Sequence, residues 1–253
     1  MADTHDGRHE MARKRVLYDL PGTAQVDVRR GIPYAATDAG ELTFDVYRPS
    51  HPVGLLPVVV FVTGVSDIGA REQLGCRINE MEAYISWGRL VAASGMAAVT
   101  YTTDADPAAN GLALLSYLRS AGGALGLDTN RLGMWAGSGN VLKALDLVHH
   151  ERTSIRSAVF CYGLMRPLDL PAEVPLLVVR AGRDETPGFN ESIDLFVAAA
   201  LQRNLALTLI NHSSGRHAFD LQDDSAATRA VVAEILRFLA THLSADPQGG
   251  ASR

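Results

Sequence analysis

The amino-acid sequence predicts one α/β domain with a doubly wound, mostly parallel sheet flanked by helices. Short apolar runs rich in β-branched residues alternate with longer segments of helical periodicity, strand then helix, five times over. Several of the runs are apolar throughout, as in strands buried on both faces of a parallel sheet. With 253 residues, 47% hydrophobic and 20% charged, the chain is large enough to fold around a substantial core without disulfides.

The predicted strands begin with two segments that we expect to form an antiparallel start to the sheet. These are "DVRRG" (27–31) and "ELTFDVYRP" (41–49), the second of which alternates apolar and polar residues. The remaining strands are expected at 57–62, 96–101, 132–136, 157–163, 175–182 and 205–211.

Helical periodicity fills the intervals between the later strands. One segment places Pro107 in its first turn and ends at glycine, which are typical helix boundaries. The predicted helices are 80–94, 106–122, 140–150, 190–204 and 223–243.

The domain is expected to span residues 16–243 without a linker or an internal repeat. The flanking segments 1–15 and 244–253 are polar or small, and we expect both to be disordered. No apolar run approaches the ~20 residues that would span a bilayer, and the N-terminal segment lacks the apolar core of a secretory signal. We therefore expect a cytoplasmic protein without a membrane partner.

Charge and cysteine content argue against a nucleic-acid-binding, disulfide-stabilised or metal-binding protein. The net charge is −5, and only the short "ARKR" at 12–15 concentrates basic residues, so no nucleic-acid partner is expected. Cys76 and Cys161 are far apart and provide neither a disulfide framework nor a metal-ligand spacing. No metal and no cofactor is predicted.

The stretch "GMWAGSGNVLKAL" (133–145) places Ser138 between a predicted strand and a predicted helix. Small residues on such a turn let a nucleophile project above a sheet, in the pattern G-x-S-x-G. Here Ala136 and Asn140 stand where that pattern has glycines. The stretch alone fits either a nucleophile or an ordinary glycine-rich turn.

A serine hydroxyl needs a base within hydrogen-bond reach, and the base needs an orienting acid. Asp184 follows one predicted strand and His217 follows the next, both at carboxyl ends, where open α/β sheets place their sites. Competing residues exist for both roles. Glu185 and Asp220 are alternative acids, and His212 is an alternative base that ranks lower because it lies at the strand end.

Four stretches of the chain resemble α/β-hydrolases of the dienelactone-hydrolase and carboxylesterase type. They are "LTFDVYRP", "GLDTNRLGMWAGSGN", "LLVVRAGRDE" and "GRHAFD", within a similarity that runs from about residue 40 to residue 243. The resemblance implies that Ser138 attacks an acyl carbon, that His217 removes its proton and that Asp184 orients the imidazole.

The same resemblance implies an oxyanion hole made of backbone N–H groups. One donor would be Gly139, and the other would come from "TGVSD" (63–67), with Val65 as the expected donor beside Gly64. This loop lacks the His-Gly-Gly-Gly sequence of many lipases and esterases, so it also fits an ordinary βα loop.

Only "LMRPLDLPAEV" (164–174) lies where such enzymes often insert a lid, so no large cap domain is predicted. Arg71 and Arg166 are candidates for binding a substrate carboxylate, or plain surface arginines. Candidate pocket residues, each of which fits the core equally well, are Trp87, Tyr162, Met165, Phe189 and Phe219.

The sequence therefore predicts a serine hydrolase that acts on a small-molecule ester or lactone. An acyltransferase or a C–C bond hydrolase with the same three residues is one alternative. A non-catalytic binding protein of this fold is another. The chain is large enough to fold alone, and the sequence does not decide between a monomer and a homodimer.

Overall fold

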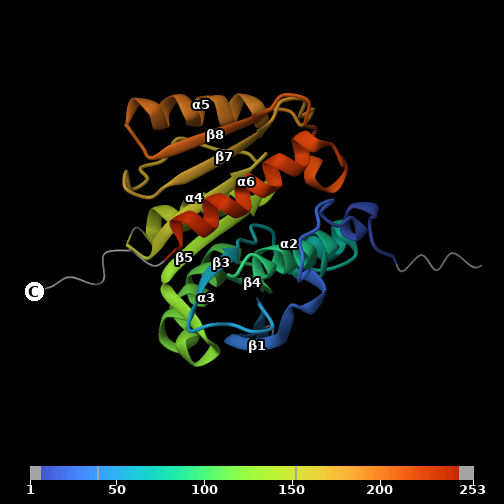
Figure 1. Cartoon of the computed structure of the whole chain (residues 1–253), viewed down its shortest axis with the longest axis vertical. Coiled ribbons are helices and arrows are strands. Elements are labelled where there is room, and N and C mark those ends of the chain that lie inside the picture. Colours follow the sequence, from blue (N-terminus) through green and yellow to red (C-terminus); the bar gives the residue numbers. More distant parts are fainter. Residues whose placement is uncertain (1–6, 39, 152, 245–253) are drawn as a thin grey trace, which may run out of the picture.

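An eight-stranded sheet forms the centre of the molecule, with helices on both faces (Figure 1). The computed structural model describes residues 7–38, 40–151 and 153–244. The strands lie in the order β1-β2-β4-β3-β5-β6-β7-β8. The pairs β1–β2 and β2–β4 are antiparallel, and all other neighbouring strands are parallel. The predicted doubly wound, mostly parallel sheet with an antiparallel start is confirmed.

The strands are β1 (Asp27–Thr37), β2 (Gly40–Arg48), β3 (Leu56–Phe61), β4 (Ala97–Tyr101), β5 (Leu127–Gly137), β6 (Ile155–Cys161), β7 (Leu176–Ala181) and β8 (Leu207–His212). The α-helices are α1 (Asp67–Leu74), α2 (Glu82–Ala93), α3 (Pro107–Ala121), α4 (Val141–His150), α5 (Phe189–Gln202) and α6 (Ala226–His242).

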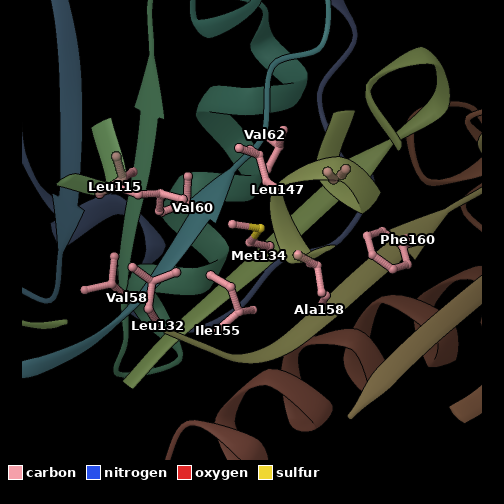
Figure 2. Close-up of a cluster of buried hydrophobic side chains, with 14 of the residues drawn as sticks. Val58, Val60, Val62, Leu115, Leu132, Met134, Leu147, Ile155, Ala158 and Phe160 are labelled. Carbon is pink, nitrogen blue, oxygen red and sulfur yellow. The ribbon is translucent and has the colours of Figure 1, made fainter. Parts of the chain in front are cut away.

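The core consists of two layers, one on each face of the sheet. On β3, Val58 and Val60 point into a layer that α3, α4 and α5 cover, and Figure 2 shows part of it. Val59 and Phe61 point the opposite way, toward α2 and α6. Because successive side chains of a strand face opposite sides, a strand that is apolar throughout has both faces covered. This packing explains why the buried strands were readable as continuous apolar runs.

Helix α1 is the one described α-helix that the sequence pattern did not predict. The Ser66 side chain caps it by accepting a hydrogen bond from the Gly69 N–H at 3.1 Å, and Gly75 ends it at φ 72°. Only Asp67 and Ala70 are buried in it. An eight-residue helix without an apolar stripe gives no periodic signal, although its two ends carry ordinary start and stop residues.

The N-terminal segment differs from the expected disordered tail over its described part. Glu10–Arg13 form a 3-10 turn in which Ala12 is fully buried. The His9 N–H donates to the Leu74 carbonyl at 2.9 Å, which ties this turn to the end of α1. Residues 1–6 and 245–253, also expected to be disordered, lie outside the described residues.

The described residues place no large cap over the carboxyl edge of the sheet, as predicted. Within the described residues, the connection from β6 to β7 holds no helix and no strand. None of the described helices combines the length and the apolar character needed to cross a membrane.

Candidate active site

Ser138 lies on a sharp turn between β5 and α4. The strand ends at Gly137, residues Ser138–Asn140 form a 3-10 turn, and α4 begins at Val141. Ser138 has φ 56°, a left-handed conformation that is uncommon for residues other than glycine and that clusters at functional sites. A Cβ on Gly163, at the end of β6, would lie 2.4 Å from the Ser138 carbonyl oxygen, so only glycine lets the neighbouring chain approach this turn.

Two hydrogen bonds link Ser138 to the predicted base and acid. The Ser138 Oγ lies 2.8 Å from His217 Nε2, and His217 Nδ1 lies 2.7 Å from Asp184 Oδ2. The Asp184 side chain is fully buried, whereas that of His217 is 30% exposed. A carboxylate at Nδ1 holds the proton on that nitrogen and leaves the Nε2 lone pair to accept from the serine hydroxyl. Three loops at the carboxyl ends of β5, β7 and β8 thus meet at one point.

The alternative residues have other partners. Glu185 is exposed, and its Oε1 lies 4.0 Å from Arg216 Nη2. The buried His212 places its Nε2 2.9 Å from the Thr228 hydroxyl oxygen, away from Ser138. Asp220 is buried and accepts hydrogen bonds from other side chains, described below. Of the candidate acids and bases, only Asp184 and His217 are linked to Ser138 by hydrogen bonds.

A cavity of about 370 Å³ opens beside Ser138. Apolar side chains make up most of its wall, and no lysine or arginine is among the described residues that line it. Its apolar and aromatic lining residues are Met11, Val65, Leu74, Ile78, Met81, Ala83, Tyr84, Trp87, Trp135, Tyr162, Ala218 and Leu221.

Known proteins resemble this chain in structure rather than in sequence. No family model and no curated protein sequence matches it. A structure described as a bacterial heroin esterase aligns with a TM-score of 0.68 and 15% identity, over 90% of this chain and 88% of that one. A thermostable esterase from Pseudomonas putida ECU1011 aligns with a TM-score of 0.67 and 15% identity, over 90% and 86%. LAE6, an alpha/beta hydrolase enzyme from the metagenome of Lake Arreo, aligns with a TM-score of 0.69 and 17% identity, over 94% and 86%.

The chain has the α/β-hydrolase fold. Identities this low show the fold alone, because one fold hosts many functions. In this fold, the turn after β5 is where a nucleophile is expected, and Ser138 occupies it.

The pocket contains a buried carboxylate that the sequence pattern did not single out as part of it. Asp220 is 2% exposed and accepts from the Tyr162 hydroxyl at 2.6 Å and from Trp87 Nε1 at 2.8 Å. Burial raises the pKa of the Asp220 carboxyl, and these two hydrogen bonds offset part of that rise. The Tyr162 ring in turn packs edge-on against the His217 ring, with centroids 5.4 Å apart. Asp220 thereby fixes two walls of the pocket.

Of the predicted pocket residues, Trp87 and Tyr162 line the cavity. Phe189 packs against the His217 ring at 5.4 Å from outside the cavity, and Phe219 is buried beneath Tyr162. Met165 is buried in the layer that α3, α4 and α5 cover.

The two candidate arginines lie away from the cavity. Arg71 lines a separate polar depression beside α1. Arg166 is half exposed and pairs with Asp146 on the surface at 2.5 Å.

The loop after β3 passes directly over the serine turn. The Gly64 N–H donates to Asn140 Oδ1 at 2.7 Å, so this N–H is already engaged. Val65 lines the cavity beside Ser138 and Gly139. Of the backbone groups expected from the sequence, the N–H groups of Val65 and Gly139 therefore remain candidates for the oxyanion donors.

No group of three or more His, Cys, Asp or Glu side chains is arranged to hold a metal ion in the described part of the chain. Cys76 and Cys161 are both buried and form no disulfide.

Proposed function

We propose that the protein is a serine esterase that cleaves small, uncharged carboxylic esters or lactones through an acyl-enzyme on Ser138. The observation that carries this proposal is the hydrogen-bonded chain from Ser138 through His217 to Asp184 beside an apolar cavity. Structural neighbours described as esterases add support at the level of the fold.

In the acylation step, Ser138 Oγ attacks the ester carbonyl carbon while His217 Nε2 takes the hydroxyl proton. The carbonyl oxygen becomes an oxyanion that accepts from the N–H groups of Val65 and Gly139. When the tetrahedral intermediate collapses, the C–O bond to the alcohol breaks and His217 returns the proton to the departing oxygen. Asp184 stabilises the imidazolium that forms in between.

In the deacylation step, water takes the place of the alcohol. His217 Nε2 removes a proton from water as the water oxygen attacks the acyl carbon. The bond to Ser138 Oγ then breaks, and the proton goes to this oxygen, which releases the carboxylic acid. The cycle requires no redox partner and no group from outside the chain except water.

The lining of the cavity indicates the class of substrate. An apolar wall suits hydrocarbon acyl or alcohol groups, which bind by leaving water. Arg71 and Arg166 lie elsewhere, and the described residues that line the cavity include no lysine or arginine to pair with a substrate carboxylate. A substrate with a free carboxylate, as dienelactone-type chemistry uses, is therefore disfavoured.

The test compares p-nitrophenyl butyrate with p-nitrophenyl hemisuccinate, which carries a terminal carboxylate on an acyl chain of equal length. We expect kcat/KM to be about tenfold or more higher for the butyrate, because the charged acyl group would lose its hydration without gaining a partner. Ser138→Ala should abolish turnover, whereas Ser120→Ala, which changes an exposed serine of α3, should leave it unchanged. Turnover that survives in Ser138→Ala, or a preference for the hemisuccinate, would contradict the proposal.

A further inference from the structure

Asn140 occupies the place where the nucleophile pattern usually has its last glycine. Its backbone conformation is not unusual, since its φ and ψ of −82° and −14° are those of an ordinary right-handed helix. The strained residue of the turn is Ser138, two positions earlier. The amide side chain of Asn140 therefore needs another explanation.

That side chain makes three hydrogen bonds and is almost completely buried. Its Oδ1 accepts from the Gly64 N–H at 2.7 Å, and its Nδ2 donates to the Tyr84 hydroxyl at 2.7 Å and to the Gly137 carbonyl at 3.2 Å. A backbone N–H can only donate and a backbone carbonyl can only accept, so these two partners determine which atom of the amide is which. The side chain thus connects the serine turn, α2 and the loop after β3.

Hydrogen bonds anchor the two peptide units that flank the Gly64–Val65 peptide. On one side lies the Asn140 bond to the Gly64 N–H. On the other side, the Thr103 hydroxyl donates to the Val65 carbonyl at 3.1 Å. The Val65 N–H belongs to the peptide unit between these two anchors, so its direction is set by both.

The loop also approaches the serine turn very closely. A Cβ on Gly64 would lie 2.9 Å from the Asn140 Cα and 3.3 Å from the Gly139 carbonyl oxygen. This contact places the loop that carries Val65 directly against the turn that carries Ser138 and Gly139. A hydrogen-bond donor that points at a developing oxyanion accelerates the reaction only if it is already in place.

We infer that Asn140 is a positioning residue of the oxyanion hole, which holds the Val65 N–H beside Ser138 through the Gly64 backbone. This inference rests on the proposed esterase function. It explains how a loop with one glycine and no His-Gly-Gly-Gly sequence provides a donor: a side-chain amide from the serine turn fixes its backbone. Glycine or alanine at position 140 has no atom that could do so.

The experiment measures kcat and KM for p-nitrophenyl butyrate in the wild type, Asn140→Ala and Asn140→Gly. Asn140→Gly restores the residue that the pattern usually has, so the turn should tolerate it. We expect kcat to fall about 10- to 100-fold in both variants with KM nearly unchanged, less than the loss of a whole oxyanion donor. The affinity for a trifluoromethyl ketone, which binds as an oxyanionic adduct of the serine, should fall by a similar factor, whereas KM reports mainly the ground state.

Asn110→Ala is the matched control. Asn110 is also a buried asparagine whose Oδ1 accepts from a backbone N–H, that of Asp104, at 2.8 Å, but it lies outside the cavity. We expect it to lower the melting temperature, as the Asn140 variants do, without the fall in kcat. If the Asn140 variants keep kcat and ketone affinity within about twofold, or if Asn110→Ala lowers both equally, Asn140 has a structural role only.

The same measurements distinguish failure of the esterase proposal from failure of the positioning role of Asn140. If the wild type neither turns over esters nor binds the trifluoromethyl ketone, the esterase proposal fails. If the wild type does both and the Asn140 variants match it, only the positioning role of Asn140 fails.

Discussion

His212 ends strand β8 and His217 follows it by five positions, and each is near a carboxylate, yet the two imidazoles differ in what their Nε2 atoms face. His217 gives Nδ1 to Asp184 and turns Nε2 toward Ser138 at the edge of a cavity. His212 turns Nε2 toward the Thr228 hydroxyl, which itself donates to Asp223 at 2.7 Å. A nearby acid and a hydroxyl therefore do not by themselves identify a catalytic base. Only His217 faces a hydroxyl at the edge of the cavity.

His212 instead supports the site from behind. Its carbonyl oxygen accepts from the Gly182 and Gly215 N–H groups, each at 2.9 Å. The Arg183 N–H also donates to the Gly215 carbonyl at 2.8 Å. These bonds join the loop that carries Asp184 to the loop that carries His217. The side chain of His217 is thus placed for chemistry, whereas the backbone carbonyl of His212 joins the two loops that place it.

The largest expected effect comes from Asp184→Asn, which leaves the shape of the acid but removes its charge. The asparagine should favour the wrong tautomer of His217 and lower kcat by about 10³- to 10⁴-fold. Steady-state kinetics on p-nitrophenyl butyrate measures this. Asp223→Asn is the control from the other pair and should leave kcat of the folded protein unchanged. An equal loss of kcat in both variants would remove the distinction between the two histidines.

Thr228→Val tests the structural role of His212. Valine has nearly the shape of threonine but cannot take part in the bond to His212 Nε2, which would leave a buried polar atom unpaired. We expect the free energy of unfolding to fall by about 1–3 kcal/mol, with kcat per folded molecule retained. Urea unfolding together with active-site titration separates the two quantities. An unchanged stability would show that the His212 side chain contributes little.

Asp67 is a second buried acid for comparison, and its partners are more distant than those of Asp184, with Arg77 Nε 3.8 Å from its Oδ2. Its Oδ2 accepts from the Thr103 N–H at 3.2 Å, and Oδ1 has no partner among the described residues. Burial raises its pKa from 3.8 to about 6. The folded state therefore binds a proton more tightly than the unfolded state, so stability falls as pH rises through the window from about 4 to about 6 and the cost persists above it.

Asp67→Asn removes this ionisation. When pH is raised from 4 to 8, we expect the free energy of unfolding of the variant to rise by about 1–2 kcal/mol relative to that of the wild type. Urea unfolding of both proteins at both pH values measures this change. A gain that is equal at pH 4 and pH 8 would mean that Asp67 does not titrate in this window.

Arg166→Ala should have the smallest effect. Arg166 pairs with Asp146 on the surface, away from the cavity, and exposed ion pairs contribute little. We expect stability to stay within about 0.5 kcal/mol, and kcat/KM for the butyrate and hemisuccinate esters to stay within about twofold. A selective loss with the hemisuccinate would return Arg166 to the substrate-binding site.

The main strands and five of the six described α-helices were predictable because apolar periodicity reflects burial on one or both faces of a sheet. Helix α1 was missed because it has no apolar stripe. Strand β5 begins at Leu127, five residues before its predicted start. Leu127 and Asp128 pair with β3 ahead of a register shift, and the polar stretch that follows gives no apolar signal.

The loop order of Ser138, Asp184 and His217 could be read from the chain, because carboxyl ends of parallel strands meet at one edge. The choice of His217 over His212 depends on which of the two imidazoles lies beside the serine, and only the folded backbone decides this. The pocket wall was less predictable. Met11 comes from a polar segment, and Asn140 looks in the sequence like a departure from a pattern, because the bond that gives it meaning joins residues 76 positions apart.

The activation of Ser138 is tested most directly by the rate at which a fluorophosphonate probe modifies it, followed by intact-mass spectrometry and peptide mapping. We expect one adduct on Ser138 in the wild type, loss of the adduct in His217→Ala, and an adduct in the folded fraction of His212→Gln. Labelling of His217→Ala at the wild-type rate, or no adduct on the folded wild type, would contradict the claim that His217 activates Ser138.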